Sequence, residues 1–354
     1  MLSITHWPYV YILLLISISL LIEKINKPSQ IAVKVLYTIN TVVICIFIYM
    51  KSYGVGADDD NYLLFLKGSE EIRKELEPAF YHLLNVMNYL KFELNDLNLF
   101  VTIVFSICAY KLSQKFNISY LFWLMVYISF GNYYELNIDH VRNALSLAVV
   151  MYAVIYLVDR EYFSYYLLIV FATLIHYSNC VFLVVPLMMT INYSLNKVVI
   201  ITLLSICATF IPMYSLISNT LLSINISILN PMMMAIQHKN IGSQYAEGFS
   251  WSLFSIQKVF LLLLFSFFYR KEFNNNKTKV ILVLYLLSLV FWAVFHEIYI
   301  FSGRFSRAFS IVEPFVIYYL IIKFKHKQSV FLLTLLYLFL IANLLIENRI
   351  GAYF

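Results

Sequence analysis

The sequence predicts an all-α, polytopic integral membrane protein, and three observations lead to this fold class. The chain has 354 residues, of which 62% are hydrophobic and only 12% are charged, whereas a soluble domain is about a quarter charged. Its mean hydropathy is +0.80. Apolar stretches of about 20 residues, the length of a membrane helix, recur along the chain. We therefore expect about 11–13 transmembrane helices in a single integral-membrane domain over residues 1–354, without a separate soluble domain.

The predicted spans follow one another along the sequence. They cover approximately residues 7–22, 31–50, 97–113, 118–134, 138–158, 162–177, 179–193, 198–218, 252–269, 279–299, 304–322 and 328–346. The stretches 162–177 and 179–193 are short and nearly continuous, which is typical of a tight helical hairpin or a partly re-entrant segment. Pro78–Phe92 is too short and too mixed to span, and its aromatic, amphipathic pattern predicts a helix at the membrane interface.

Lysine and arginine in short loops predict the orientation, because such loops are retained in the cytoplasm. With the N-terminus outside, the cytoplasmic loops collect Lys24, Lys27, Lys34, Lys111, Lys115, Arg160, Lys197, Arg270, Lys271, Lys277, Lys279, Lys323, Lys325 and Lys327. Most carboxylates then fall on the other side. Two larger loops, about 51–96 and 219–250, also lie on the outer face, so we expect the protein to work there.

Arg142 is the first candidate functional residue, because a charge at membrane depth is costly and usually serves a cavity, a partner or a substrate. It lies near the start of the apolar segment 138–158, after Asp139 and His140. The first turn of a helix favours anions, so an arginine there needs an anionic partner. That partner is either Asp139, three residues away, or a ligand such as phosphate, which matches the guanidinium fork.

Arg304 and Arg307 repeat this pattern at the start of the segment 304–322. They are three residues apart and share one helical face, which predicts a second anion-binding group, with simple snorkelling to the interface as the alternative. Glu313 lies deeper in the same segment, before Pro314, which is expected to kink the helix. Glu313 is predicted to accept a hydrogen bond from Arg142 across the bundle or to line a polar cavity.

Asp58, Asp59 and Asp60 stand together in the first outer loop, after Gly54 and Gly56. Neighbouring carboxylates can hold a divalent ion through oxygen or supply a general base. The alternative is a solvated acidic turn.

Glu77 and His176 are candidate acid–base residues at the predicted outer face. Glu77 precedes Pro78 at the start of the interfacial helix, where capping is as good an explanation as catalysis. His176 closes the segment 162–177, and its ordinary pKa near neutrality suits proton transfer. A hydrogen-bonded interface histidine is the alternative.

Several functional classes lack their motifs. The sequence has no Walker A pattern, no Rossmann glycine pattern, no HExxH and no GxSxG. This counts against ATP-driven transport and against zinc or serine hydrolysis.

Four sequence blocks, in order, resemble the EpsG family of Wzy-type polysaccharide polymerases. They are DDDNYLLFL with the following EPAFYHLLNVM, then HVRNALSLAVVMYAVIYL, FATLIHYSNCVFLVVPL and GRFSRAFSIVEPFVIYYLI. The resemblance runs over most of the chain, from about residue 50 to 325. The resemblance implies a multi-spanning protein of the bacterial cytoplasmic membrane. Such a protein joins repeat units carried on undecaprenyl diphosphate into O-antigen, capsule or exopolysaccharide, on the outer side of the membrane.

The resemblance also implies roles for the candidate residues. Arg142, Arg304 and Arg307 would bind the diphosphate and stabilise the charge of the leaving group. His176, or a carboxylate such as Asp60 or Glu77, would deprotonate the acceptor hydroxyl. The remaining candidates would contact substrate, and they are Asp58, Asp59, Asp139, His140 and Glu313. We expect no metal and no cofactor, because arginines can neutralise the diphosphate.

The expected partners are the lipid-linked oligosaccharide, as donor and acceptor, the bilayer and a chain-length regulator, with no nucleic acid. Three other functions compete with this one. A ligase that moves finished glycan uses similar chemistry. A transporter of lipid-linked sugars would carry polar groups along a path through the bilayer, whereas these candidates gather at one face. A membrane acyltransferase would need a histidine-rich intramembrane motif, which the sequence lacks.

Overall fold

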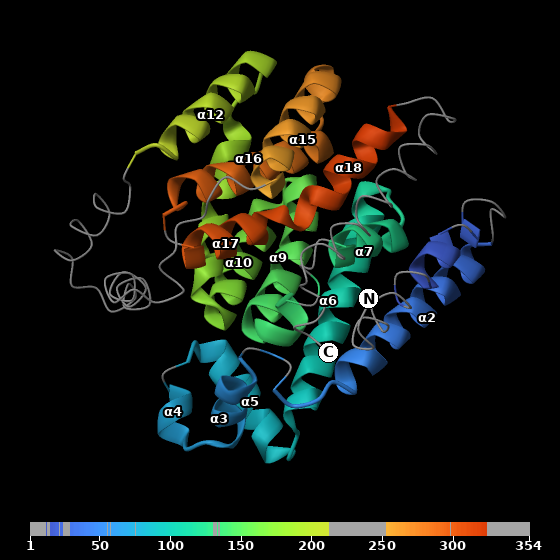
Figure 1. The fold of residues 1–354 in the computed structure, drawn as a ribbon, viewed down its shortest axis with the longest axis vertical. Helices are drawn as coiled ribbons and strands as arrows, with labels where there is room; N and C mark the ends of the chain where they lie inside the picture. The colour runs from blue at the N-terminus through green and yellow to red at the C-terminus, as the bar shows by residue number, and fades with distance from the viewer. Residues whose placement is uncertain are drawn as a thin grey trace. The chain divides into compact units, whose positions relative to one another are not determined.

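The structure, a computed structural model, describes residues 12, 15–20, 22–23, 29–54, 56, 58–74, 76–129, 133, 135–211, 253–297 and 299–323. Every regular element in this part of the chain is a helix (Figure 1), so the predicted all-α membrane fold is confirmed. The chain forms two compact units. Unit 1 comprises Met1–Leu183 with Ile321–Phe354, and unit 2 comprises Val184–Leu320. The single integral-membrane domain, the orientation and the total number of spans stay predictions.

Five helical stretches of the described residues are long and apolar enough to cross a membrane. They are α2 (Gln30–Tyr49), α6 (Leu94–Phe116), α9 (Val141–Asp159), α16 (Asn276–Val294) and the stretch Ser302–Ile322. Each coincides within a few residues with a predicted span. The last stretch is interrupted, because α17 (Tyr299–Phe309) passes through the 3₁₀ turn η7 (Ser310–Val312) into α18 (Glu313–Ile322). The interruption precedes Pro314, as expected from a residue without a backbone N–H.

Apart from the helices of the stretch between α2 and α6, the other elements are shorter. In unit 1 they are α7 (Tyr120–Ser129), the π-helical turn η2 (Glu135–Asp139), α10 (Tyr162–Ile175) and the 3₁₀ segment η3 (Tyr177–Val184). In unit 2 they are α11 (Val185–Thr190), α12 (Leu195–Ala208), α15 (Leu253–Tyr269) and η6 (Arg270–Glu272). The nearly continuous pair predicted at 162–193 is therefore α10 followed by η3 and α11. The predicted span 7–22 is described only in part, and the predicted span 328–346 and loop 219–250 lie outside the described residues.

In unit 1, α9 is the central helix. It packs against both α6 and α10, and α6 in turn packs against α2 and α7. Of the apolar stretch of α9, 72% is buried, against 22% for α2. Small residues such as Ala144 and Ala148, both fully buried, let neighbouring helices approach α9 closely.

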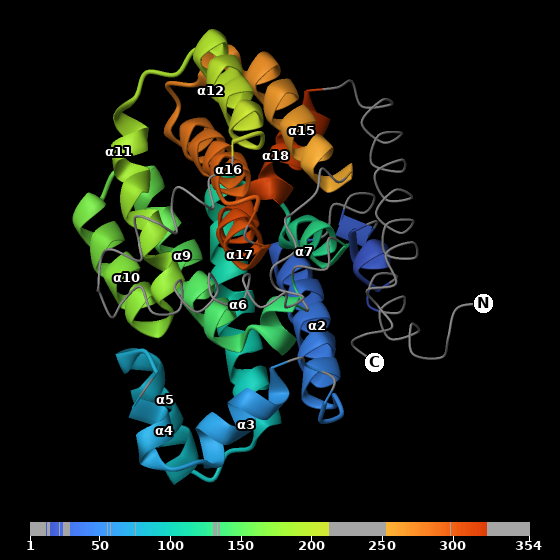
Figure 2. The ribbon, with the colours of Figure 1, turned by 60° about the vertical axis from the view of Figure 1, so that its left-hand side comes forward.

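The stretch between α2 and α6, predicted as the first outer loop, folds into three short helices at one end of α6 (Figure 2). These are α3 (Asp59–Lys67), α4 (Glu70–Lys74) and α5 (Pro78–Tyr89). The helix predicted at Pro78–Phe92 is thus present, and its apolar face buries Phe80, Leu84 and Met87 at helical spacing. Because α5 packs against α3 and α10, it brings the residue that precedes it, Glu77, toward the bundle.

In unit 2, α16 is the central helix. It packs against α11, α12, α15, α17 and η7, and 72% of its apolar stretch is buried. Phe291 lies between two rings of the neighbouring helix α17, with centroids 5.5 Å from Phe305 and 5.3 Å from Phe309. These contacts hold α17 against α16.

Candidate active site

Three side chains from distant parts of unit 1 meet at the carboxylate of Glu77. Its Oε2 accepts a hydrogen bond from Arg142 Nη1 at 2.9 Å, and its Oε1 lies 2.9 Å from His176 Nδ1. The backbone N–H of Tyr177 also donates to Oε1, at 3.4 Å. Because an ionised carboxylate only accepts hydrogen bonds, Nδ1 of His176 carries the proton and the lone pair of the neutral ring resides on Nε2.

Each member of this cluster stands at a helix end. Glu77 precedes α5, which has Pro78 in its first turn, and its side chain makes no capping hydrogen bond. Of the two explanations for Glu77, capping is therefore not the one the geometry supports. His176 follows the last residue of α10 in extended conformation, which turns its ring out of the helical path. Arg142 lies in the first turn of α9, directly after the π-helical turn η2.

The electrostatics of the cluster keep Glu77 ionised. Burial by itself would raise its pKa, but the hydrogen bond with His176 and the positive charge of Arg142 outweigh that effect. Together they lower the pKa of Glu77 from 4.5 to about 2. A carboxylate with so low a pKa is a poor proton acceptor at neutral pH. Between Glu77 and His176 as candidate bases, the geometry therefore favours His176, with Glu77 as its orienting partner.

Arg142 is held by aromatic rings as well as by Glu77. Its guanidinium carbon lies 5.6 Å from the ring centre of Phe65 and 6.0 Å from that of Phe80, within the range of cation–π attraction. Its Nε has no hydrogen-bond partner among the described residues. The Arg142 side chain is 27% exposed, compared with 6% for Glu77. A ligand can therefore reach the guanidinium while Glu77 remains bound to it.

Asp59 is the first residue of α3, and it is embedded where the chain passes from α2 into α3. It is 1% exposed and pairs with the buried Lys51 at 2.6 Å. The same carboxylate accepts from the backbone of Gly54 and Gly56, at 3.0 and 3.2 Å. A Cβ at Gly56 would lie 2.5 Å from Asp59 Oδ1, so this close approach requires glycine. The solvated acidic turn predicted as the alternative for the triplet is wrong for Asp59, because this residue is buried against Lys51.

The neighbours of Asp59 point to other partners. Asp58 Oδ2 lies 3.4 Å from Nδ1 of His140, the residue that precedes α9, and both side chains are partly exposed. Asp60 is exposed and accepts a hydrogen bond from the Tyr53 hydroxyl. Asp139 is 6% exposed. Asp58 and His140 thus extend the polar surface near the start of α9, two residues before Arg142.

The remaining candidates belong to unit 2. Arg304 is exposed and Arg307 half-buried on α17. Glu313 is 1% exposed and accepts a hydrogen bond from the Tyr285 hydroxyl at 3.1 Å. That Arg142, Arg304 and Arg307 act on one ligand stays a prediction.

Lys258 is a residue that the sequence analysis missed. It is 2% exposed, and its ammonium group donates to Ser288 and Ser306 at 2.6 Å and to Ser310 at 2.7 Å. The signal was available, because Lys258 is the one lysine inside the apolar segment Leu253–Tyr269, and intramembrane charges are functional candidates. The serines gave no signal, since hydroxyl residues are common in membrane helices.

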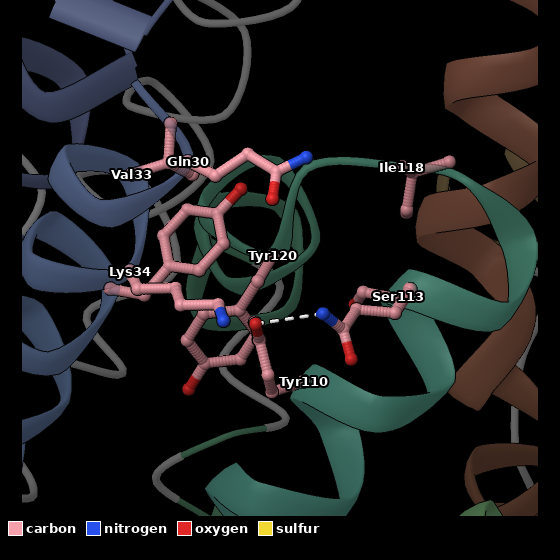
Figure 3. A pocket seen from close by; sticks show the side chains of 9 residues that line it. Gln30, Val33, Lys34, Tyr110, Ser113, Ile118 and Tyr120 are labelled. Atoms are coloured by element: carbon pink, nitrogen blue, oxygen red, sulfur yellow. Dashed lines mark hydrogen bonds between the residues drawn. The ribbon is translucent and has the colours of Figure 1, made fainter. Parts of the chain in front are cut away.

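A groove of about 350 Å³ lies between α2 and α6, over α7, in unit 1 (Figure 3). It is lined by the rings of Tyr37, Tyr110 and Tyr120, and Lys34 extends into it from α2. Gln114 Nε2 donates to the Tyr110 hydroxyl at 2.7 Å (Figure 3). The residues that α6 contributes to this groove lie in the last third of the helix, whereas α5 precedes the first turn of α6. The groove is thus separate from the Glu77 cluster.

Fold and site together define a class of protein: a helical integral membrane protein with an ionised carboxylate, an arginine and a histidine assembled at the ends of apolar helices. A comparison with protein-family models matches the EpsG family over residues 34–353, and the chain belongs to this family. The family is Wzy-type polymerase-like, and the chain has a polysaccharide-polymerase-like function in general terms. The resemblance seen in the four sequence blocks is thereby confirmed. No curated protein and no solved structure matches the chain.

Proposed function

We propose that this protein is a glycosyltransferase that polymerises oligosaccharide repeat units carried on undecaprenyl diphosphate. The reaction takes place at the outer face of the bacterial cytoplasmic membrane and builds O-antigen, capsule or exopolysaccharide. One observation carries the proposal: in a chain of the EpsG family, Glu77 joins Arg142 and His176 at 2.9 Å each. The cluster thus combines a cation that suits a diphosphate with a histidine that can accept a proton.

The proposed reaction balances without a cofactor. A hydroxyl of the incoming repeat unit attacks the anomeric carbon at the end of the growing chain, and a new glycosidic C–O bond forms. The C–O bond to the diphosphate breaks, and undecaprenyl diphosphate leaves with the bonding electrons. The hydroxyl proton passes to Nε2 of His176. The glycosyl diphosphate bond supplies the free energy, so no nucleotide sugar is needed.

Each residue of the cluster has a separate role in this proposal. Glu77 holds Nδ1–H of His176, which fixes the tautomer and stabilises the imidazolium that forms, as the carboxylate does in a serine-protease triad. Arg142 binds the diphosphate and stabilises the charge that develops on it. A guanidinium suits this role because two of its N–H groups match two phosphate oxygens.

The other candidates support the site in different ways. Arg304 and Arg307 supply further positive charge toward the diphosphate from α17, and Asp58, Asp60 and His140 contact sugar hydroxyls. Asp59, Asp139 and Glu313 are buried. Burial favours a role in shaping the site rather than direct contact with substrate.

The experiment that tests the proposal is the length distribution of surface polysaccharide in a strain lacking the gene, resolved on a gel beside its parent. A ladder reduced to one repeat unit supports a polymerase. Full-length polymer left on the lipid carrier indicates a ligase, and lipid-linked single units held at the inner leaflet indicate a transporter. An unchanged ladder contradicts the proposal.

Complementation of that strain localises the activity to the cluster. The Arg142→Ala gene should fail to restore the ladder. Arg270→Ala is the matched control, because the Arg270 guanidinium also lies over an aromatic ring, 5.0 Å from the centre of Phe267, but has no place in the proposed site. It should restore the ladder fully.

A further inference from the structure

Lys258 forms the centre of a buried polar cluster in unit 2. Four of its partners among the described residues stand on other helices, with Ser288 on α16, Ser306 on α17, and Ser310 and Glu313 in the broken stretch that follows. The serines accept its hydrogen bonds at 2.6–2.7 Å, and Glu313 interacts with it electrostatically. One ammonium group therefore ties α15 to three further elements of the unit.

Stability alone is a weak explanation for this cluster. Lys258 is 2% exposed and Glu313 1% exposed, and burying such a pair is often no better for stability than apolar residues of similar volume. One oxygen of the pair, Glu313 Oε2, has no hydrogen-bond partner among the described residues. A costly, incompletely satisfied pair inside apolar helices indicates a functional requirement.

The serines define one face of α17 and of the turn η7 that follows it. Ser302 and Ser306 on α17 and Ser310 at the start of η7 recur every four residues, which is about one helical turn. Ser302 donates to the backbone oxygen of Trp292 at 3.2 Å, and the backbone oxygen of Ser306 accepts from Ser288 at 2.8 Å. This serine face is thus the one turned to α15 and α16.

The two arginines of α17 lie away from the serine face. At about 100° per residue, Arg304 is about 160° and Arg307 about 100° around the helix from Ser306. The burial agrees with this geometry, since Ser306 is 3% exposed while Arg304 is exposed and Arg307 half-buried. Fixing the serines therefore fixes the direction in which both arginines point.

We propose that Lys258 is a positioning residue, which sets the rotation of α17 about its axis and thereby directs Arg304 and Arg307 toward the substrate. The use of those arginines rests on the proposed function, whereas the rotation does not. Because the ammonium group binds two hydroxyl acceptors one turn apart, it restricts the rotation of α17 more than a single contact would.

Labelling of introduced cysteines tests the rotation without any assay of polymerisation. In a chain whose four natural cysteines are replaced, Arg304→Cys and Ser302→Cys are exposed separately to a water-soluble maleimide in membranes. Ser302 lies about 160° around the helix from Arg304 and is buried, so the thiol of Arg304→Cys should react at least about 10-fold faster than the thiol of Ser302→Cys. In Lys258→Met/Glu313→Gln, which leaves no unpaired charge, this ratio should fall below about 3. An unchanged ratio overturns the proposal.

Ser306→Ala/Ser310→Ala provides a second test if the charge variant does not insert. It removes two acceptors of Lys258 and keeps the Lys258–Glu313 pair, and it should also lower the labelling ratio below about 3. Ser266→Ala is the matched control, because that buried hydroxyl donates within its own helix, to Leu262 O at 2.7 Å. The control should keep the full ratio, and a ratio retained in the double-serine variant overturns the proposal.

Polysaccharide length separates failure of this inference from failure of the proposed function. If Arg304→Ala leaves the ladder unchanged, the proposed use of the arginines is wrong, yet the labelling ratios still report on the rotation. If Arg304→Ala removes the ladder while Ser306→Ala/Ser310→Ala leaves both ladder and labelling intact, Lys258 is not a positioning residue. We expect the serine variant to raise the apparent KM for the lipid-linked donor about 10-fold, with normal amounts of inserted protein.

Discussion

The two compact units each bring a cation and a carboxylate together among apolar helices, but with opposite accessibility. In unit 1, Arg142 pairs with Glu77 while 27% of its side chain stays exposed. In unit 2, Lys258 is 2% exposed, and its three donor protons have serine acceptors. The planar guanidinium retains donors that can bind a ligand, whereas the ammonium group of Lys258 has its hydrogen bonds within the protein. The comparison teaches that a buried charge can organise a site and an accessible one can act in it.

Replacing Arg142 gives the largest expected effect. Arg142→Ala should abolish chain extension, by about 1000-fold or more, because a diphosphate leaving group loses its stabilising charge. The amount of inserted protein should stay normal. Arg142→Lys should recover less than about a tenth of the activity, since lysine keeps the charge but loses the fork. Ladder length and membrane immunoblots measure both. Normal polymerisation by the lysine variant would show that two-point binding of the diphosphate is wrong.

Replacing Asp59 tests a buried ion pair of unit 1, that of Asp59 with Lys51. Asp59→Asn leaves the buried Lys51 without its counter-charge, which costs about 3–5 kcal/mol of folding free energy. Asp60→Asn is the matched control, because Asp60 is exposed and should change stability by less than about 0.5 kcal/mol. Thermal unfolding in detergent measures the two variants, and equal unfolding temperatures would refute the assignment.

Acidification should weaken the Glu77 cluster. The pKa of Glu77 is lowered to about 2 from 4.5, so its contribution to stability is fully present above about pH 5 and is lost as the pH falls through about 2. The difference corresponds to about 3 kcal/mol. Unfolding followed from pH 6 to pH 2 should show a steeper decline for the native chain than for Glu77→Gln. Parallel curves would contradict the assigned interactions.

His176→Gln should lower the rate of chain extension about 100-fold, the usual contribution of a general base. Glutamine can keep a hydrogen bond to Glu77 but accepts no proton, so binding of the donor should change little. Rates in proteoliposomes over a range of pH measure the effect. If the variant keeps both the native rate and its pH dependence, another group is the base.

Removal of metal ions should have the smallest effect. Polymerisation in proteoliposomes treated with EDTA should match the untreated sample, because the proposed charge neutralisation comes from arginines. Loss of activity that magnesium restores would assign metal binding to the acidic triplet, with Asp58 and Asp60 as the accessible ligands.

Much of the fold follows from hydropathy alone. Each of the five long apolar stretches of the described residues coincides with a predicted span, because a bilayer demands continuous apolar helices whatever their neighbours. The helix α5 was equally predictable, since an amphipathic pattern after a Glu-Pro start is a local signal. The helices α3 and α4 were not predicted, because their short polar sequences are stabilised by packing against α5 and α6 rather than by propensity.

The sequence by itself determined the membrane fold and the family, and it singled out Arg142 and His176 as candidates by their type and depth. It left Glu77 between capping and catalysis, and it gave no signal for the partners of Lys258. Only the tertiary structure showed the contacts of these residues, since Glu77 meets Arg142 and His176 across 65 and 99 residues of sequence. Hydropathy is a property of each segment, whereas the pairing of charges depends on which helix faces pack together, and many packings satisfy the same hydropathy.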